Sequence, residues 1–271
     1  MTTFIEDLLN KKNISFTKEN DILLIPSRNL AIKILKLHEH STLSGKSSVY
    51  NLKLLQDFGK RNIRLIQIFE PESANHKKIL TRIKSYLGIL PHRIHARKCI
   101  IKKITNQIKN KFLNKYHMQG QDYGSSVCLG IFCKNRLVSV ASFIRRGDSI
   151  FELSRFSGNG NFYVSGGASK IMSYFEDNYK PKLIYSFADR RWSAGNVYLK
   201  LGFVETKTTL PSYWYFKQNS IILFHKFGFR RKYLPKKLDF FNEEFSEWEN
   251  LKNNGFDRIY DCGLMKFEKS Y

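Results

Sequence analysis

The chain has 271 residues, 42% of them hydrophobic and 14% aromatic, so it can bury one large core or two modest ones. This composition excludes wholesale disorder, and no run approaches the roughly 20 apolar residues of a membrane span. Lys and Arg number 46 against 23 Asp and Glu, a formal charge of +23 at pH 7 that favours an anionic partner.

The first ninety residues predict a small α/β unit. Thr3 and Glu6 have the spacing of a capping box at the start of a short amphipathic helix. The predicted elements that follow are the strands Ile22–Pro26 and Leu30–Leu35, the helix Val49–Phe58, the strand Ile63–Phe69, and a helix that Ser73 caps and Gly88 ends. Pro91 then marks a boundary between a first domain, residues 1–91, and a second, residues 92–271.

The second part predicts a mixed sheet with helices, so the whole chain is expected to be α/β (α+β). Its hairpins have Asn135 and Gly147 at their turns. The predicted ranges, in chain order, are Ile94–Ile101, Thr105–Tyr116, Val127–Cys133, Leu137–Ile144, Ile150–Ser157, Ala168–Glu176, Leu183–Ala188, Ser193–Leu201, Tyr213–Phe216, Ile221–Phe224 and Ile259–Phe267.

The positive charge is concentrated in two stretches. Ser73–Gln121 holds twelve Lys and Arg and no acid, and Lys226–Lys237 is also free of acids. An AT-rich genome raises Lys content, but it raises Glu too and does not clear acids from such a stretch. Nucleic acid, duplex DNA first, is the expected partner, with an acidic protein as the alternative. The expected contacts are Arg93, Arg97, Lys98, Lys102 and Lys103.

A glycine-containing loop precedes the predicted helix at Ala168. Backbone N–H groups at the start of a helix can hold a pyrophosphate, and glycines allow it to approach closely. An ordinary turn explains the same glycines. The candidate phosphate-binding residues are Val164, Ser165, Gly166, Gly167 and Ala168.

A second motif, Tyr198-x-x-x-Gly202-Phe203, lies downstream, after the next predicted strand. Together with the glycine loop it resembles the GNAT superfamily of acyl-CoA-dependent N-acyltransferases, over roughly residues 93–224. The resemblance implies acyl-CoA, acetyl-CoA by preference, as cofactor. It departs at Tyr163, where the family's loop carries Arg or Gln.

The resemblance also implies that Tyr198 protonates the departing thiolate, although a packing tyrosine accounts for the same residue. A base must take a proton from the attacking amine, and Glu152 and Asp189 are the candidates. Asp189 is equally consistent with a solvated turn or a salt bridge. Simple alternation along the strand places Arg155 on the face of Leu153, away from Glu152.

The segment Ile22–Leu87 resembles the Vsr-like, EDxHD-type homing endonucleases of phages. Aligned on Pro26, however, the acidic positions fall on Asn20, Ile22 and Lys33, and the later histidine on Asn51, although His40 matches. A lysine in a would-be Mg²⁺ site repels the ion. A retained DNA-binding scaffold with no bound metal is therefore expected, with Glu70 and Glu72 as surface or helix-capping acids.

The leading hypothesis is a cytoplasmic N-acyltransferase acting on or at nucleic acid, in the host cytoplasm if the chain is phage-encoded. The alternatives are a non-catalytic DNA-binding remnant of a homing endonuclease and an active metal-dependent endonuclease that uses Asp21, His40 and Glu70. The acceptor amine, the acyl group and the oligomeric state are left open.

Overall fold

The computed structural model describes residues 2–42 and 47–271, and the chain divides into two compact units. The first unit comprises Met1–Ala74, Asp189–Trp192 and Thr209–Leu264; the second comprises Asn75–Ala188, Ser193–Thr208 and Met265–Tyr271. This division differs from the predicted boundary at Pro91. Its physical reason is that a late segment of the chain completes the core of the first unit.

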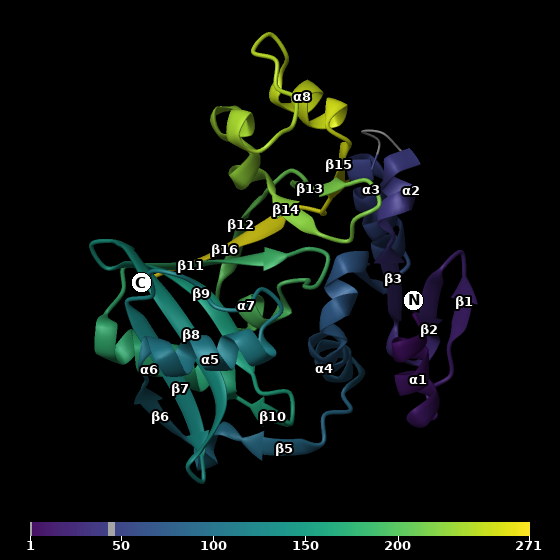
Figure 1. The fold of residues 1–271 in the computed structure, drawn as a ribbon. Coiled ribbons are helices and arrows are strands. Elements are labelled where there is room, and N and C mark those ends of the chain that lie inside the picture. Colours follow the sequence, from purple (N-terminus) through teal and green to yellow (C-terminus); the bar gives the residue numbers. More distant parts are fainter. Residues whose placement is uncertain (1, 43–46) are drawn as a thin grey trace. The chain divides into compact units, whose positions relative to one another are not determined.

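The first unit contains a four-stranded sheet in the order β1-β2-β3-β4 (Figure 1). β2 pairs antiparallel with β3, which pairs in parallel with β4, and the predicted strands here are confirmed. Ala31, Phe58 and Leu65 form a small core between α3 and this sheet. The bounds are α1 Thr3–Lys11, β1 Thr17–Glu19, β2 Ile22–Ile25, β3 Leu30–Leu35, α2 Leu37–Thr42, α3 Ser47–Lys60 and β4 Arg64–Phe69.

Residues 209–264 add a second sheet to the first unit, in the order β14-β13-β15. Phe216 and Ile259 from this sheet are buried in one cluster with Leu35, Leu37 and Phe69 of the N-terminal segment. Burial of such side chains is worth about 1.5–3 kcal/mol each, which explains why the late segment joins this unit. The bounds are β13 Tyr213–Lys217, β14 Leu223–His225, α8 Glu247–Asn253 and β15 Phe256–Tyr260.

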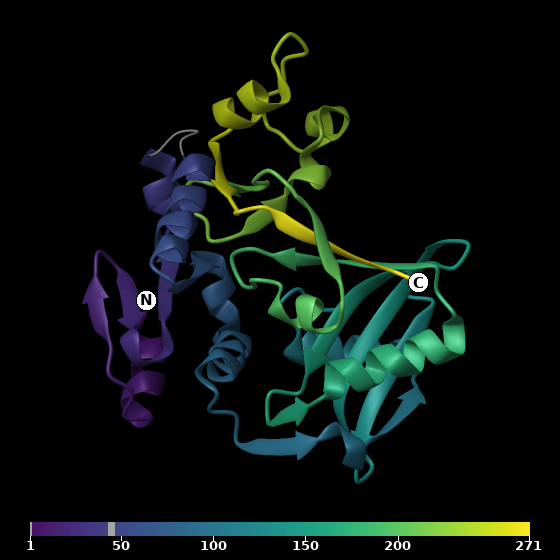
Figure 2. The ribbon, with the colours of Figure 1, turned by 180° about the vertical axis from the view of Figure 1, so that it is seen from behind.

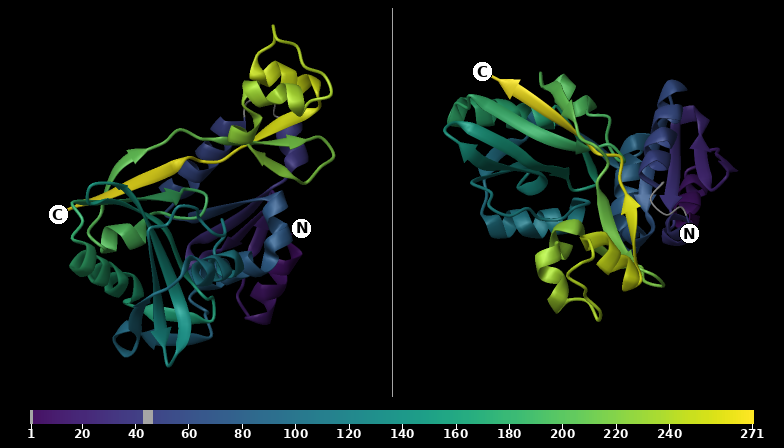
Figure 3. Two further views of the ribbon diagram at one scale, coloured as in Figure 1. Left: turned by 60° about the vertical axis from the view of Figure 1, so that its left-hand side comes forward. Right: turned by 90° about the horizontal axis from the view of Figure 1, so that it is seen from above.

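The second unit is built on a seven-stranded mixed sheet in the order β12-β16-β11-β9-β8-β7-β6, so the predicted α/β class is confirmed. The last strand, β16, lies between β12 and β11 (Figure 3). The bounds are α4 His76–Leu87, β5 His92–His95, β6 Ile100–Lys103, α5 Asn106–Tyr116, β7 Val127–Cys133, β8 Arg136–Gly147, β9 Ile150–Gly158, β10 Phe162–Ser165, α6 Gly167–Tyr179, β11 Leu183–Asp189, α7 Asn196–Lys200, β12 Val204–Thr208 and β16 Leu264–Ser270.

Helices α5 and α6 cover opposite faces of this sheet (Figures 1 and 2). On the α6 face, the ring of Phe175 stacks on Phe143 with centroids 3.7 Å apart. On the α5 face, Phe112 and Leu113 pack against Val140. The alternation of β8 therefore supplies both cores.

Four predicted boundaries were wrong. The cap of the first helix is Thr2, and its hydroxyl donates to Glu6. The predicted strand Ile94–Ile101 is two strands, β5 and β6, separated by the 3-10 turn Ala96–Lys98.

The predicted strand Ile259–Phe267 is divided at Gly263 into β15 and β16. Gly263 has φ +79°, and a Cβ there would lie 2.2 Å from the carbonyl oxygen of Thr209. The helix expected from Ser73 begins at His76, with Asn75 at its N-cap.

Within residues 2–42 and 47–271, every helix is too short or too polar to cross a bilayer.

Candidate functional site

The site is organised by two parallel strands that part. β11 pairs in parallel with β9, with Leu183 opposite Ile150 at one end and Tyr185 opposite Glu152 at the other. Both strands continue beyond this point in the described structure, but they are no longer paired with each other. Parting of neighbouring strands in the middle of a sheet exposes backbone edges that a ligand can occupy. The gap opens at Leu153 on β9 and Ser186 on β11.

Tyr198, from α7, reaches this opening. The Ser186 hydroxyl lies 2.7 Å from the carbonyl oxygen of Leu153 and 2.9 Å from the Tyr198 hydroxyl. A carbonyl can only accept, so Ser186 donates to Leu153 and Tyr198 donates to Ser186. Burial raises the pKa of Tyr198 above the ordinary phenol value, so the phenol holds its proton at neutral pH.

A pocket with about 270 Å³ of empty space lies beside Tyr198. It is apolar apart from the tyrosine and is shared by β9, α6 and the segment around α7. The lining residues are Leu153, Phe156, Ala168, Ile171, Met172, Val197, Tyr198 and Leu201. Its lining suits an apolar group.

An open cleft with about 790 Å³ of empty space lies at the start of α6. Gly166 is the N-cap of this helix, with φ +75°, so Val164–Ala168 does turn the chain from β10 into α6 as predicted. The cleft is lined by His95, Ala96, Arg97, Ser165, Gly166 and Lys170. The structure thus brings Arg97, predicted as a nucleic-acid contact, to the predicted phosphate loop.

Lys170 holds the two walls of this cleft together. Its ammonium donates to the carbonyl oxygens of Ala96, at 3.0 Å, and Cys99. β10 pairs in parallel with β5, from Phe162–His92 to Ser165–His95. Tyr163, the departure from the family pattern, is half exposed, and the Arg93 guanidinium lies 5.6 Å from its ring centroid. The loop therefore has cations beside it that come from the β5 segment.

A β-bulge at Ser154 changes which side chains share a face. Arg155 lies opposite Ser142 and Leu153 opposite Phe143, so Ser154 has no partner on β8. The bulge returns Arg155 to the α5 face, on the side of Glu152, and the predicted alternation was wrong. Arg155 is held there by the carbonyl oxygens of Gly120 and Ser154.

Neither predicted base is free. Glu152 accepts from Arg146 at 2.6 Å, and Asp189 accepts from Arg191 at 3.0 Å. Asp189 also belongs to the first compact unit, whereas Glu152 and Tyr198 belong to the second. Their roles as bases stay predictions, and Asp189 shows the salt bridge that was the alternative interpretation.

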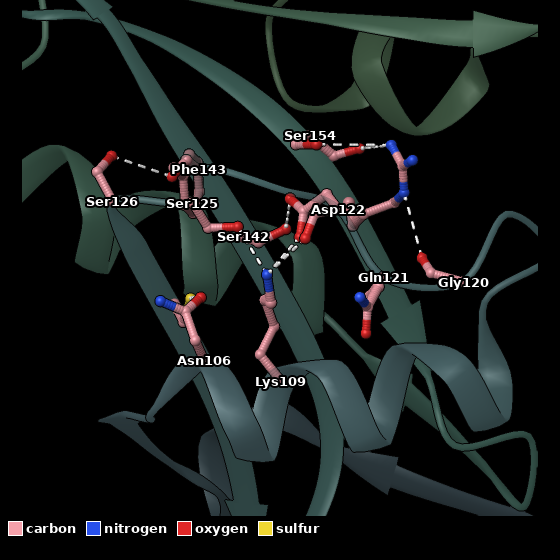
Figure 4. Close-up of polar contacts among 12 residues, drawn as sticks. Asn106, Lys109, Gly120, Gln121, Asp122, Ser125, Ser126, Ser142, Phe143 and Ser154 are labelled. Carbon is pink, nitrogen blue, oxygen red and sulfur yellow. Dashed lines mark hydrogen bonds and ion pairs between the residues drawn. The ribbon is translucent and has the colours of Figure 1, made fainter. Parts of the chain in front are cut away.

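Sequence reasoning missed a buried ion pair beneath this face of the sheet (Figure 4). Lys109 and Asp122 lie 2.6 Å apart, with 2% and 4% of their side chains exposed. Asp122 also accepts from Ser142 at 2.7 Å, and Lys109 donates to Ser125. The signal was present: Lys109 lies three and four residues before Phe112 and Leu113, on the buried face of α5.

The other predicted nucleic-acid contacts, Arg93, Lys98, Lys102 and Lys103, are exposed, and none has an ion pair within the described part of the chain. Two are near aromatic rings: Lys102 lies 5.6 Å from Phe132, and Lys103 lies 5.2 Å from Tyr179. These cations line β5, the following turn and β6.

The acids of the nuclease-like segment have structural partners. Asp21 pairs with Lys36, Glu70 accepts the N–H of Leu37 at the start of α2, and Glu72 pairs with Arg191. Lys33 is buried in β3, and Asn51 donates to the carbonyl oxygen of Tyr260 at 2.9 Å. The His40 side chain lies outside the described residues. Within the described ranges, no group of three His, Cys, Asp or Glu is placed to hold a metal ion.

No family model matches the chain, and no curated protein matches it by sequence. Solved structures similar to it include a GNAT family acetyltransferase from Elizabethkingia anophelis with acetyl-CoA bound, at 11% identity and TM-score 0.35, covering 64% of this chain and 99% of that one. A Bacillus subtilis acetyltransferase in complex with CoA matches at 11% and 0.37, covering 64% and 98%. The ribosomal-protein-S18-alanine N-acetyltransferase of Escherichia coli matches at 9% and 0.37, covering 64% and 93%. Sequence identities and TM-scores this low assign no activity to this chain.

Proposed function

We propose that the protein is an acyl-CoA-dependent N-acyltransferase whose reaction centre is the opening between β9 and β11. The observation that carries the proposal is the buried Tyr198 hydroxyl at that opening, with the apolar pocket beside it. The open cleft lies at the first turn of α6, and residues of this helix also line the apolar pocket. A cofactor that carries both phosphates and a long thiol-bearing arm needs a place for each of these parts.

The residues of the cleft fit the phosphates of CoA. Gly166 carries no side chain, and the nearest atom to a Cβ there would be that of Ala96 at 3.7 Å, so the approach to the helix N–H groups is open. Arg97 supplies the cation that the loop lacks at Tyr163. CoA, when bound, supplies an acyl group activated as a thioester.

The chain's own residues then act at the opening. The phenol of Tyr198 stacks on Phe267 with centroids 4.9 Å apart, which fixes the ring. In the structure its proton is directed to Ser186, one hydrogen bond from the edge of β9. Turning that proton toward a departing thiolate requires rotation about a single C–O bond and no movement of the ring.

The test of the cofactor site is Arg97→Gln. Loss of a charge-assisted hydrogen bond of about 1.5–3 kcal/mol should weaken acetyl-CoA binding by roughly tenfold to a hundredfold, measured by calorimetry. Lys98→Gln is the matched control, because Lys98 is an exposed neighbour that does not line the cleft. Equal losses in both variants, or no heat with the wild type at millimolar acetyl-CoA, would refute the site. Gly166→Val is a poorer test, since φ +75° strains any residue with a Cβ.

We further propose that the acceptor lies on or at nucleic acid. The support is the row of exposed cations on β5 and β6, which have no acidic partners within the described ranges. Of the row, Arg97 is shared with the cofactor cleft, so acyl-CoA and nucleic acid are expected to compete there.

Duplex DNA binding should weaken steeply with salt. Replacing Arg93, Lys98, Lys102 and Lys103 with Gln should reduce the slope of log K against log [salt] by about 3 to 4, because each phosphate contact contributes about 0.9. Four Gln substitutions at the exposed residues Lys53, Lys200, Lys207 and Lys252 are the control with equal charge. The same change of slope in both proteins would mean that binding follows net charge and not this surface.

For the nuclease-like segment, we propose a scaffold that does not cut DNA. Its acids are engaged by Lys36, by the N–H of Leu37 and by Arg191, and Lys33 occupies the strand where a metal ligand would be needed. Mg²⁺-dependent nicking of supercoiled plasmid that is lost on Asp21→Asn would favour the endonuclease alternative instead.

A further inference from the structure

Two cysteines of the second unit lie opposite each other at one end of the antiparallel β6–β7 pair. The register of this pair runs without a shift as far as Ile100, which lies opposite Phe132. One step further, the same register brings Cys99 opposite Cys133, the last residue of β7. Cys99 directly precedes β6 and has an extended backbone, so the strand geometry continues to it. The backbone therefore places the two cysteines side by side on neighbouring strands.

Both side chains lie on the face of the sheet that α6 covers. Cys99 is buried in the cluster between this helix and the sheet, and Cys133 packs against the same cluster. The other two cysteines are placed elsewhere. Cys128 lies on the opposite face, where its thiol donates to the side chain of Asn106 on α5 at 3.4 Å, and Cys262 belongs to the first unit. Cys99 and Cys133 are thus matched in both register and face.

The two cysteines form a closely spaced pair. Opposite residues in an antiparallel ladder alternate between hydrogen-bonded pairs, with Cα atoms about 5.5 Å apart, and non-hydrogen-bonded pairs at about 4.5 Å. The N–H of Ile104 donates to the carbonyl oxygen of Cys128, which the register places opposite it, at 3.0 Å. Alternation from this hydrogen-bonded position makes Cys99 a non-hydrogen-bonded one. Its N–H accordingly bonds Ala96 and its carbonyl accepts from Lys170, both away from β7.

The two thiols differ in access. Cys99 is 2% exposed, whereas Cys133 is partly exposed beside the β7–β8 turn. Burial raises the pKa of the Cys99 thiol to about 11, and the adjacent Cys133 thiol adds to this rise. A dissolved oxidant therefore reaches Cys133 first, and Cys99 is the thiol that reacts second.

Cys99 also belongs to the wall of the open cleft. Its thiol donates a weak hydrogen bond to the carbonyl oxygen of His95, at 3.8 Å, and its own carbonyl accepts from Lys170. His95 and Lys170 line the cleft, as do Ala96 and Arg97 of the turn that Cys99 ends. Oxidation of the Cys99 sulfur removes its proton, so the hydrogen bond to His95 is lost and the cleft wall changes.

We propose that Cys99 and Cys133 are a thiol oxidation site, at which a low-molecular-weight disulfide converts them to an intramolecular disulfide and so weakens ligand binding in the cleft. The thiolate of Cys133 attacks the oxidant, a mixed disulfide forms, and one thiol of the oxidant leaves. The Cys99 sulfur then loses its proton and attacks the Cys133 sulfur, which releases the second thiol. Two protein thiols are oxidised, and the oxidant is reduced to two thiols that take up the two protons.

The spacing of the strands makes this disulfide a reversible one. Disulfides favour Cα atoms about 5.5–6 Å apart, so a closely spaced pair closes under strain and is readily reduced again. Relief of that strain moves the start of β6 away from β7, and the turn at Ala96 and Arg97 moves with it. The effect on the cleft rests on the proposed function, whereas the disulfide itself does not.

The test of the disulfide uses the whole protein and oxidised glutathione, followed by intact mass and peptide mapping without reductant. The expected product has lost two hydrogen atoms, carries a cross-link from Cys99 to Cys133, and returns to the starting mass with dithiothreitol. Cys133→Ser, at a partly exposed position, should form no cross-link. Cys128→Ser is the matched control with the same number of thiols and should react as the wild type does. A lasting glutathione adduct on Cys133, or a cross-link to Cys128, would overturn the proposal.

Calorimetry with acetyl-CoA tests the effect on the cleft. The oxidised wild type should bind about tenfold more weakly than the reduced protein, because displacement of Arg97 weakens a charge-assisted hydrogen bond. Cys133→Ser should bind equally before and after treatment with oxidised glutathione. Equal affinities of the oxidised and reduced wild type would refute the effect on the cleft. A protein that binds no acetyl-CoA in either form fails as an acyltransferase, and peptide mapping still decides whether the oxidation site exists.

Discussion

Tyr198→Phe should lower acyl-transfer turnover by roughly 10²–10⁴-fold while leaving the affinity for acetyl-CoA nearly unchanged, because it removes a proton donor and keeps the ring. The ring contacts the pocket and stacks on Phe267, so its packing survives the substitution. The measurement is release of free CoA thiol under saturating acetyl-CoA, with calorimetry for the affinity. Since burial raises the pKa of Tyr198, turnover should show no loss of this acid below about pH 10.

Ser186→Ala is the matched control for that prediction. Ser186 is the hydrogen-bond partner of the Tyr198 hydroxyl, so a structural role for the pair predicts similar damage in both variants. Proton donation predicts otherwise, because the alanine variant keeps the phenol and frees its proton from Ser186. Turnover of Ser186→Ala within about tenfold of wild type, beside a much slower Tyr198→Phe, supports proton donation; comparable losses would contradict it.

Asp122→Asn should destabilise the second unit by about 3–5 kcal/mol, because it leaves the Lys109 ammonium buried without a counter-charge. Denaturant unfolding of the whole protein measures the loss. A double variant, Lys109→Met with Asp122→Leu, should lose less than the sum of the two single losses, since no unpaired charge remains. Additive losses would show that the two side chains do not act as a pair.

The same carboxylate gives a defined acid sensitivity. Burial would raise the pKa of Asp122, but hydrogen bonds from Lys109 and Ser142 outweigh it and lower the value to about 2. The ordinary value is about 3.9, so this stabilisation is complete above about pH 5 and is lost as the pH falls from about 4 through 2. The Asn variant should lack this component of the acid transition.

Much of the fold was predictable because local patterns agree with it. The hairpins around Asn135 and Gly147 and the buried run of β4 are set by turn chemistry and apolar periodicity, and their strands were predicted to within a few residues. The assignment of residues 209–264 was not predictable, because it depends on Phe216 and Ile259 meeting Leu35 and Phe69 across more than a hundred residues.

The candidate site was partly predictable. The turn at Gly166 and the position of Tyr198 follow from short motifs. In the structure Gly166 lines the open cleft and Tyr198 lines the apolar pocket. The face on which Arg155 lies depends on one extra residue, Ser154, and a bulge leaves no signature in alternation. The engagement of Glu152 by Arg146 is likewise a tertiary contact that spacing does not reveal.

The way the chain passes between its two units has a consequence for its synthesis. It changes unit after Ala74, Ala188, Trp192, Thr208 and Leu264, so neither unit is a continuous piece of sequence. During vectorial translation Leu35 and Phe69 leave the ribosome long before Phe216 and Ile259, which bury them. The first unit therefore cannot mature first: its nascent form presents an apolar surface until Ile259 has been synthesised, and chaperones that shield such surfaces can act on it until then.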